Sequence, residues 1–113
     1  MDLLTGWAAV ALVYSGRPDP KWAVEADLAD ELENVWLSLP LLIAGVDEPR
    51  PSLGYRGCCL VAPDGRRWTA YRRSVELVSR DSREVRDDKQ MKFEARVLAS
   101  AAPGVLPPWV VVG

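Results

Sequence analysis

The clearest pattern of apolar and polar positions lies in residues 55–73, which predict a β-hairpin. Two runs rich in aromatic, branched and thiol side chains flank the segment 62–65, whose sequence is Ala-Pro-Asp-Gly. Pro63 presets φ at the first turn position, and Gly65 readily takes a positive φ. The segment therefore predicts a type I turn closed by a glycine bulge.

This turn also predicts the register of the hairpin. Leu60 then faces Trp68 and Cys58 faces Ala70, because side chains on one face of a strand recur every second residue. We expect these four apolar residues to face the core, framed by arginines. The opposite face is mixed, and could meet solvent, a helix or a partner; it carries Gly57, Cys59, Val61, Arg67, Thr69 and Tyr71.

Residues 6–14 form a nearly continuous apolar run, which suits a buried strand or a short buried helix. We favour the strand, because larger residues at Val10, Leu12 and Tyr14 alternate with smaller ones and residues 15–20 break the chain directly afterwards. As a central strand, it would lie beside the hairpin.

An amphipathic helix is predicted for residues 21–39, where apolar residues recur at steps of three and four and acids cover the other side. Asp19 followed by Pro20 suits a helix start, although residues 22–24 can instead be extended, with the helix opening near Glu25 or Ala26. Pro40 ends the helix.

After the hairpin, residues 74–78 alternate polar with apolar and predict a further strand or an extension of the hairpin. A second helix is expected to start at Ser82 or Asp87 and to end at the Pro-Gly pair 103–104. The apolar tail, residues 105–113, should be held as a final strand or against the core, since exposed valines beside a tryptophan favour aggregation.

These elements predict one compact α+β domain over residues 1–113, with a mainly antiparallel sheet of four to five strands and two helices packed on one face. The length and the hydrophobic content of 49% suffice for one core. Residues 1–55 carry nine acidic and three basic residues, whereas residues 56–113 carry seven and eleven. Net charges of −6 and +4 favour oriented docking or self-association, and a homodimer through the tail or a sheet edge fits that pattern.

Cysteine usage and hydropathy indicate a cytoplasmic protein. Cys58 and Cys59 are adjacent, and adjacent side chains in a strand point to opposite faces, so we expect free thiols in a reducing compartment. The apolar run near the N-terminus is far shorter than a membrane span, and no basic region precedes it. We expect no membrane association.

The chain has no histidine, which excludes Ser-His-Asp and Cys-His catalysis and histidine-ligated zinc. It also lacks a Cys-x-x-Cys pair, a Walker loop, a GxGxxG motif and a nucleophile elbow. We therefore favour a protein that is not an enzyme, although catalysis by carboxylates, arginines, tyrosines or the two thiols stays open, and we expect no cofactor, no metal site and no catalytic residue.

Guanidinium groups and a tyrosine make the best binding candidates. They are Arg17, Arg56, Arg67, Tyr71 and Arg73. Our interpretation is a non-enzymatic interaction or accessory protein that docks on a protein or peptide partner through a sheet edge or the arginine-rich hairpin. Two alternatives stay open: nucleic-acid binding by the arginine and aromatic side chains of the hairpin, and a small-molecule or anion site near Arg17 and Tyr71. The arginines can also pair with the acidic helix of the same chain.

Overall fold

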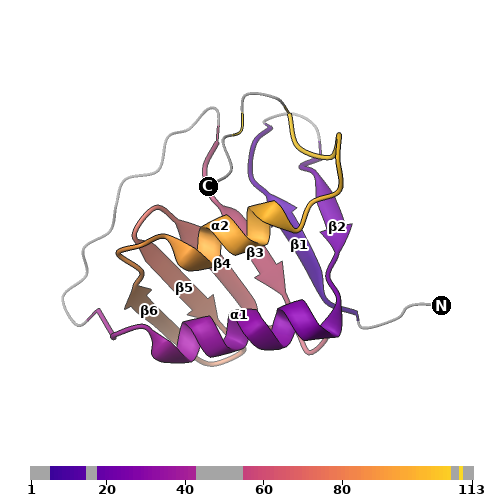
Figure 1. Ribbon diagram of the computed structural model, residues 1–113. Coiled ribbons are helices and arrows are strands. Elements are labelled where there is room, and N and C mark those ends of the chain that lie inside the picture. The colour runs from indigo at the N-terminus through magenta and orange to yellow at the C-terminus, as the bar shows by residue number, and fades with distance from the viewer. Residues whose placement is uncertain (1–5, 15–17, 43–54, 108–109, 111–113) are drawn as a thin grey trace.

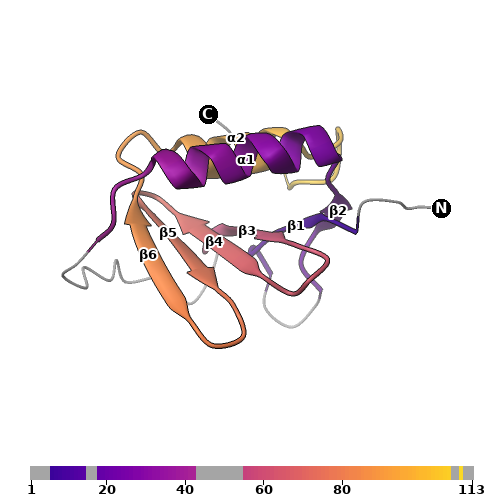
Figure 2. The ribbon, with the colours of Figure 1, turned by 90° about the horizontal axis from the view of Figure 1, so that it is seen from below.

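Six strands form one antiparallel sheet, and two helices lie on one face of it, in the computed structural model of the protein (Figure 1). The structure describes residues 6–14, 18–42, 55–107 and 110. The strand order across the sheet is β2-β1-β3-β4-β5-β6. Figure 2 shows both helices on the same side of this sheet. The predicted α+β architecture is confirmed, with six strands in place of four to five.

The elements follow each other as two strands, a helix, four strands and a helix. They are β1 (Ala8–Ala11), β2 (Lys21–Ala23), α1 (Ala26–Ser38), β3 (Cys58–Val61), β4 (Arg67–Tyr71), β5 (Ser74–Val78), β6 (Arg83–Asp87) and α2 (Lys92–Ala99). Among the described residues, no helix combines the length and the apolar character that a membrane crossing requires.

Strand β1 lies inside the sheet between β2 and β3, so the predicted central strand beside the hairpin is confirmed. Asp19 does not start a helix as expected. Its carboxylate Oδ1 instead accepts hydrogen bonds from the backbone N–H groups of Val13, at 2.9 Å, and Tyr14, at 2.7 Å. Asp19 thus caps the backbone donors that follow β1, and the chain returns after Pro20 as strand β2.

The β3–β4 hairpin has the predicted register, with Leu60 opposite Trp68 and Cys58 opposite Ala70. Its turn also follows the expectation: the N–H of Gly65 donates to the carbonyl of Ala62 at 3.0 Å, and Gly65 has φ +96°. The apolar side chains of this register are buried in the core.

Helix α1 begins at Ala26, which confirms the alternative that leaves Trp22 in an extended segment. Ala29, Leu32 and Trp36 bury one stripe of the helix. Arg86 of strand β6 completes its C-terminal end. The Nη1 atom of Arg86 donates to the carbonyls of residues 36, 37 and 39, and its guanidinium lies 4.6 Å from the ring centroid of Trp36. A helix end leaves such carbonyls without intrahelical donors, so Arg86 ties α1 to the edge of the sheet.

The expected helix start at Ser82 or Asp87 is wrong, because residues 83–87 form the edge strand β6 and α2 begins only at Lys92. The capping residue is Asp88. Its carboxylate accepts hydrogen bonds from the N–H of Lys92, at 3.1 Å, and of Phe93, at 2.8 Å. Phe93 is fully buried, whereas Met91, directly before the helix, is 45% exposed.

One face of the sheet forms the core with the two helices. Its most deeply buried residues are Ala9, Leu32, Leu60, Trp68, Val75, Phe93 and Val97. From the C-terminal tail, Val110 packs into this core. That contact fits the expectation of a tail held against the core, and Trp109 lies outside the described residues.

Two glycines at the hairpin have positive φ, and replacing each by alanine tests whether the close approach of the backbone at Gly57 matters for stability. A Cβ atom on Gly57, at φ +113°, would lie 2.6 Å from the carbonyl oxygen of Ala70, whereas a Cβ on Gly65, at φ +96°, would meet nothing within 4 Å. We predict that Gly57→Ala lowers the free energy of unfolding by about 2 kcal/mol or more, because backbone strain and a clash add together.

Gly65→Ala is the matched control and should cost only about 1 kcal/mol, since it keeps the strain but has no clash. Urea unfolding of both variants and the wild type measures the difference. Equal losses for the two substitutions would contradict the role of the close approach at Gly57.

Candidate functional site

The structure distributes the predicted binding residues over both ends of the hairpin. Arg17 lies outside the described residues. The Nη2 atom of Arg56 donates to the carbonyl of Tyr14 at 2.6 Å and lies 3.8 Å from Oδ1 of Asp19, so this guanidinium helps to hold the end of β1. Arg73 is 3.7 Å from a carboxylate oxygen of Asp87.

Arg67 and Tyr71 start and end strand β4, and they share one face of it because they are an even number of residues apart. Their Cα atoms are therefore separated by roughly 13 Å. Tyr71 is buried, with its ring centroid 6.2 Å from that of Tyr55. Arg67 is exposed. The described residues hence do not converge on one small site, and Arg67 and Arg73 are the predicted residues that are exposed.

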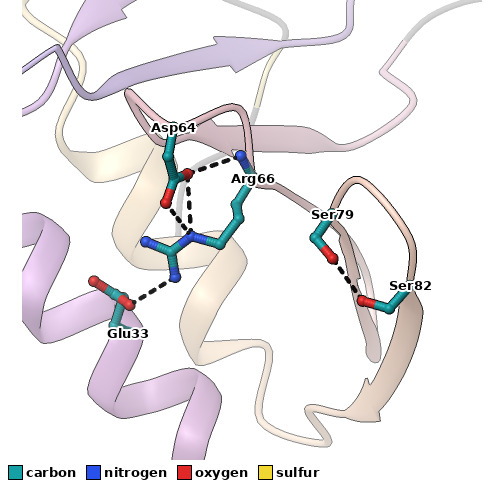
Figure 3. Close-up of polar contacts among 5 residues, drawn as sticks. All are labelled: Glu33, Asp64, Arg66, Ser79 and Ser82. Atoms are coloured by element: carbon teal, nitrogen blue, oxygen red, sulfur yellow. Dashed lines mark hydrogen bonds and ion pairs between the residues drawn. The ribbon is translucent and has the colours of Figure 1, made fainter.

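Arg66, at the tip of the same hairpin, is engaged within the protein. Its Nε atom donates to both carboxylate oxygens of Asp64, at 3.1 and 2.9 Å, and its Nη1 lies 3.3 Å from Oε2 of Glu33 on α1 (Figure 3). The guanidinium also lies 5.0 Å from the ring centroid of Trp68 and 5.9 Å from that of Trp7. Intramolecular pairing with the acidic helix, which we expected for the arginines, is thus found at Arg66.

The same close-up shows the neighbouring β5–β6 turn, where the side-chain oxygens of Ser79 and Ser82 lie 2.5 Å apart (Figure 3). The N–H of Ser79 also donates to the carbonyl of Ser82 at 3.0 Å. Local hydrogen bonds of serine side chains are typical of tight turns, so we assign this pair a structural role.

A buried polar cluster joins α2 to the hairpin at the end opposite the hairpin turn, where β4 leads into β5. Glu94 is only 7% exposed, and its Oε1 accepts a hydrogen bond at 2.7 Å from the N–H of Arg72, which turns between β4 and β5 with φ +55°. Its Oε2 accepts a hydrogen bond from the hydroxyl of Tyr55. The thiol of Cys58 points to the backbone carbonyl of Glu94, with 3.8 Å between sulfur and oxygen.

Each acidic group of this cluster holds its proton more strongly than usual. Burial raises the pKa of Glu94, and the negative charge of Asp88 adds to the increase against the opposing hydrogen bonds from Tyr55 and Arg72. Burial, reinforced by the charge of Glu94, raises the pKa of the Cys58 thiol well above its ordinary value. Burial likewise raises the pKa of Tyr55. A protonated thiol and a protonated phenol are poor nucleophiles, so the arrangement is suited to locking elements together and not to covalent catalysis.

The sheet face opposite the two helices carries the second candidate site, which we call the helix-free face. The strand register places there Ala8, Val10, Lys21, Ala23, Cys59, Val61, Arg67, Thr69, Tyr71, Ser74, Glu76, Val78, Arg83, Val85 and Asp87. The alternation of side chains turns these residues away from the Trp68 side, and Figure 2 shows that neither helix lies over them. Val78 is 41% exposed, and Arg67 and Lys21 are exposed as well.

Arg67 lies across the middle of the helix-free face. Its Nη2 atom is 3.1 Å from the sulfur of Cys59, and this sulfur is 3.5 Å from the Oγ1 of Thr69. Cys59 is fully buried although it faces away from the helices. Both cysteines are free thiols, as expected. Arg67, Cys59 and Thr69 thus form a polar centre. Valines from the strands β1, β3 and β5 border it.

Sequence reasoning identified the hairpin part of this face but not its neighbours. Glu76 and Val78 come next to the hairpin only through the pairing of β4 with β5, and Lys21 joins the face one strand beyond β1 through the pairing of β2, β1 and β3. The alternation in residues 74–78 was the available signal for Val78. Nothing in the sequence pattern of the second helix indicated that Glu94 is buried. Among the described residues, no group of acidic, cysteine or histidine side chains is arranged to hold a metal ion.

No family model matches the chain, and comparisons with the curated proteins and with the solved structures find no match.

The buried cluster predicts a pH effect on stability. The pKa of Glu94 in the folded protein is raised above its ordinary value of 4.5, so the folded state favours the neutral carboxyl group. That stabilisation is complete below pH 4.5 and is lost as the pH rises through the folded-state pKa. Relative to Glu94→Gln, which stays neutral, the wild type should become less stable as the pH rises.

Urea unfolding of the two proteins between acidic and neutral pH measures this difference. Glu25→Gln, which removes an exposed carboxyl group outside the cluster, is the control and should keep the pH profile of the wild type. A difference between wild type and Glu94→Gln that stays constant with pH would show that Glu94 titrates normally in the fold.

Proposed function

We propose that this protein is a non-enzymatic interaction protein that docks on a protein partner through the helix-free face of its arginine-rich hairpin. The observation that carries the proposal is the arrangement around Arg67. An exposed guanidinium lies over a buried thiol and is paired across the strands with Val61 on one side and Val78 on the other. Arginine within an apolar surround is a composition typical of the energetic centres of protein interfaces.

The state of the titratable groups supports a role without catalysis. Glu94, Tyr55 and Cys58 have raised pKa values because they are buried. They bind to each other and to backbone groups across α2 and the hairpin, which accounts for their perturbation without a substrate. The sequence also lacks histidine, the commonest general base.

Nucleic-acid binding, the first alternative, has less support. Binding of single strands without sequence preference relies on aromatic side chains on which bases stack. Within the described residues no aromatic side chain is exposed, and the two aromatics of strand β4, Trp68 and Tyr71, are 1% and 4% exposed. The small-molecule or anion site near Arg17 and Tyr71 stays a prediction, with Tyr71 buried and Arg17 outside the described residues.

A cytoplasmic location belongs to the same proposal. Cys58 and Cys59 are adjacent free thiols on opposite faces of β3, and a reducing compartment suits unpaired cysteines.

Photo-crosslinking tests the docking function. A photoreactive amino acid is introduced at Val78 on the helix-free face, or at Leu37 as a control, and the protein is irradiated in its native source. Leu37 is 67% exposed and lies on α1, in the opposite layer of the molecule. We expect a discrete covalent adduct from position 78, none from position 37, and loss of that adduct when Arg67→Glu is added.

Arg67→Glu is an exposed substitution and should change the free energy of unfolding by less than about 1 kcal/mol, which circular dichroism during urea unfolding checks. Adducts of equal yield from both positions, or an adduct from position 78 that survives Arg67→Glu, would contradict docking through this face.

A further inference from the structure

The charge on the helix-free face is unbalanced toward positive. Arg83 forms an ion pair with Glu76, and Asp87 on the same face is paired with Arg73, so these charges offset each other. Arg67 and Lys21 are exposed, and neither forms an ion pair with any residue in the described part of the chain. Within the described residues, the positive charges of Arg67 and Lys21 are therefore not offset by a paired carboxylate.

The guanidinium of Arg67 can donate further hydrogen bonds. A guanidinium carries five N–H donors, and among the described residues the polar side-chain contact of Arg67 is the sulfur of Cys59, which is a weak acceptor. A carboxylate can accept two of these donors side by side. The contact with Cys59 holds the guanidinium against the sheet, so its position is fixed before a partner arrives.

The opposite layer of the molecule carries the opposite charge. Asp27 and Asp30 lie exposed on α1 and form no ion pair with described residues. An acidic partner is repelled by this layer and attracted to the helix-free face, so electrostatics orient its approach.

We infer that the partner docked on the helix-free face is an acidic protein segment, in which carboxylates alternate with aliphatic side chains. This inference rests on the proposed function. The carboxylate would pair with Arg67, and the aliphatic groups would pack on Val61 and Val78, which flank Arg67 in the neighbouring strands, and on Val10, one strand further along in β1. A nucleic acid offers phosphates but no aliphatic side chains, and the valines would remain uncovered.

Titrations followed by NMR of the full-length, nitrogen-labelled protein test the inference. The probes are a short peptide of glutamate, valine and serine, a counterpart with glutamine in place of each glutamate, and a single-stranded oligothymidylate. We expect the glutamate peptide to shift the amide signals of Val61, Arg67 and Val78, with an affinity that falls as salt is added.

Arg67→Gln should weaken binding of the glutamate peptide by about fivefold. Arg96→Gln is the matched control, because Arg96 lies on α2 and is paired with Glu31 at 2.9 Å; it should leave the affinity unchanged.

Every other outcome refutes the acidic partner, and each has its own consequence for the proposed docking function. Equal binding of the glutamate and glutamine peptides at the helix-free face would refute the acidic partner but keep docking through this face. Shifts caused by the oligothymidylate alone would refute it in favour of nucleic acid. If no probe shifts these signals at millimolar concentration, the acidic partner is refuted, and crosslinking at Val78 decides separately whether the docking function also fails.

Discussion

The packing of both helices against one face of the sheet is the contact on which the rest of the structure depends. Trp68 stands in a row of paired residues with Leu60 and Ala9, and this row is almost completely removed from water. Burying a tryptophan of this kind stabilises a protein by roughly 3 to 5 kcal/mol relative to alanine. Because these apolar side chains point toward the helices, the other face of the same strands keeps its polar side chains and its exposed arginine.

Small residues let the helices approach the sheet closely. Ala9, Ala11 and Ala70 are completely buried in the strands, opposite Leu32 of α1 and Phe93 of α2 in the same core. Short side chains on the sheet and long ones on the helices thus share one core. The buried hydrogen bonds of Glu94 to Tyr55 and Arg72 then fix α2 at one end of the hairpin, where apolar packing alone would leave its position along the strands less specific.

Local chemistry made the hairpin predictable, whereas β6 depends on contacts that are distant in sequence. Pro63, Asp64 and Gly65 determine their own turn, and the turn determines the register. Strand β6 instead places Glu84 and Arg86 on the side of the helices, where the sequence pattern leads one to expect apolar residues. Arg86 is accommodated there because the end of α1 supplies three carbonyl acceptors and an aromatic ring. No pattern within residues 83–87 predicts those partners.

The candidate site was predictable to a similar extent. The alternation in the hairpin correctly placed Arg67 and Tyr71 on the face opposite Trp68. It could not show that Tyr71 is buried, that Arg56 binds the end of β1 or that Arg73 lies beside Asp87, since these contacts arise from the packing of separate segments. The same limit applies to Lys21, which strand pairing alone brings onto the helix-free face.

The closure of α1 by Arg86 also has a consequence for the order in which the chain acquires its structure during synthesis. The carbonyls of Leu37 and Leu39 accept hydrogen bonds from Arg86, which follows 49 and 47 positions later in the sequence. Strand β6 must therefore have left the ribosome and paired with β5 before the last turn of α1 is complete. Until then these carbonyl groups can bond only to water. The C-terminal half of the protein therefore supplies the donor that completes the end of the N-terminal helix.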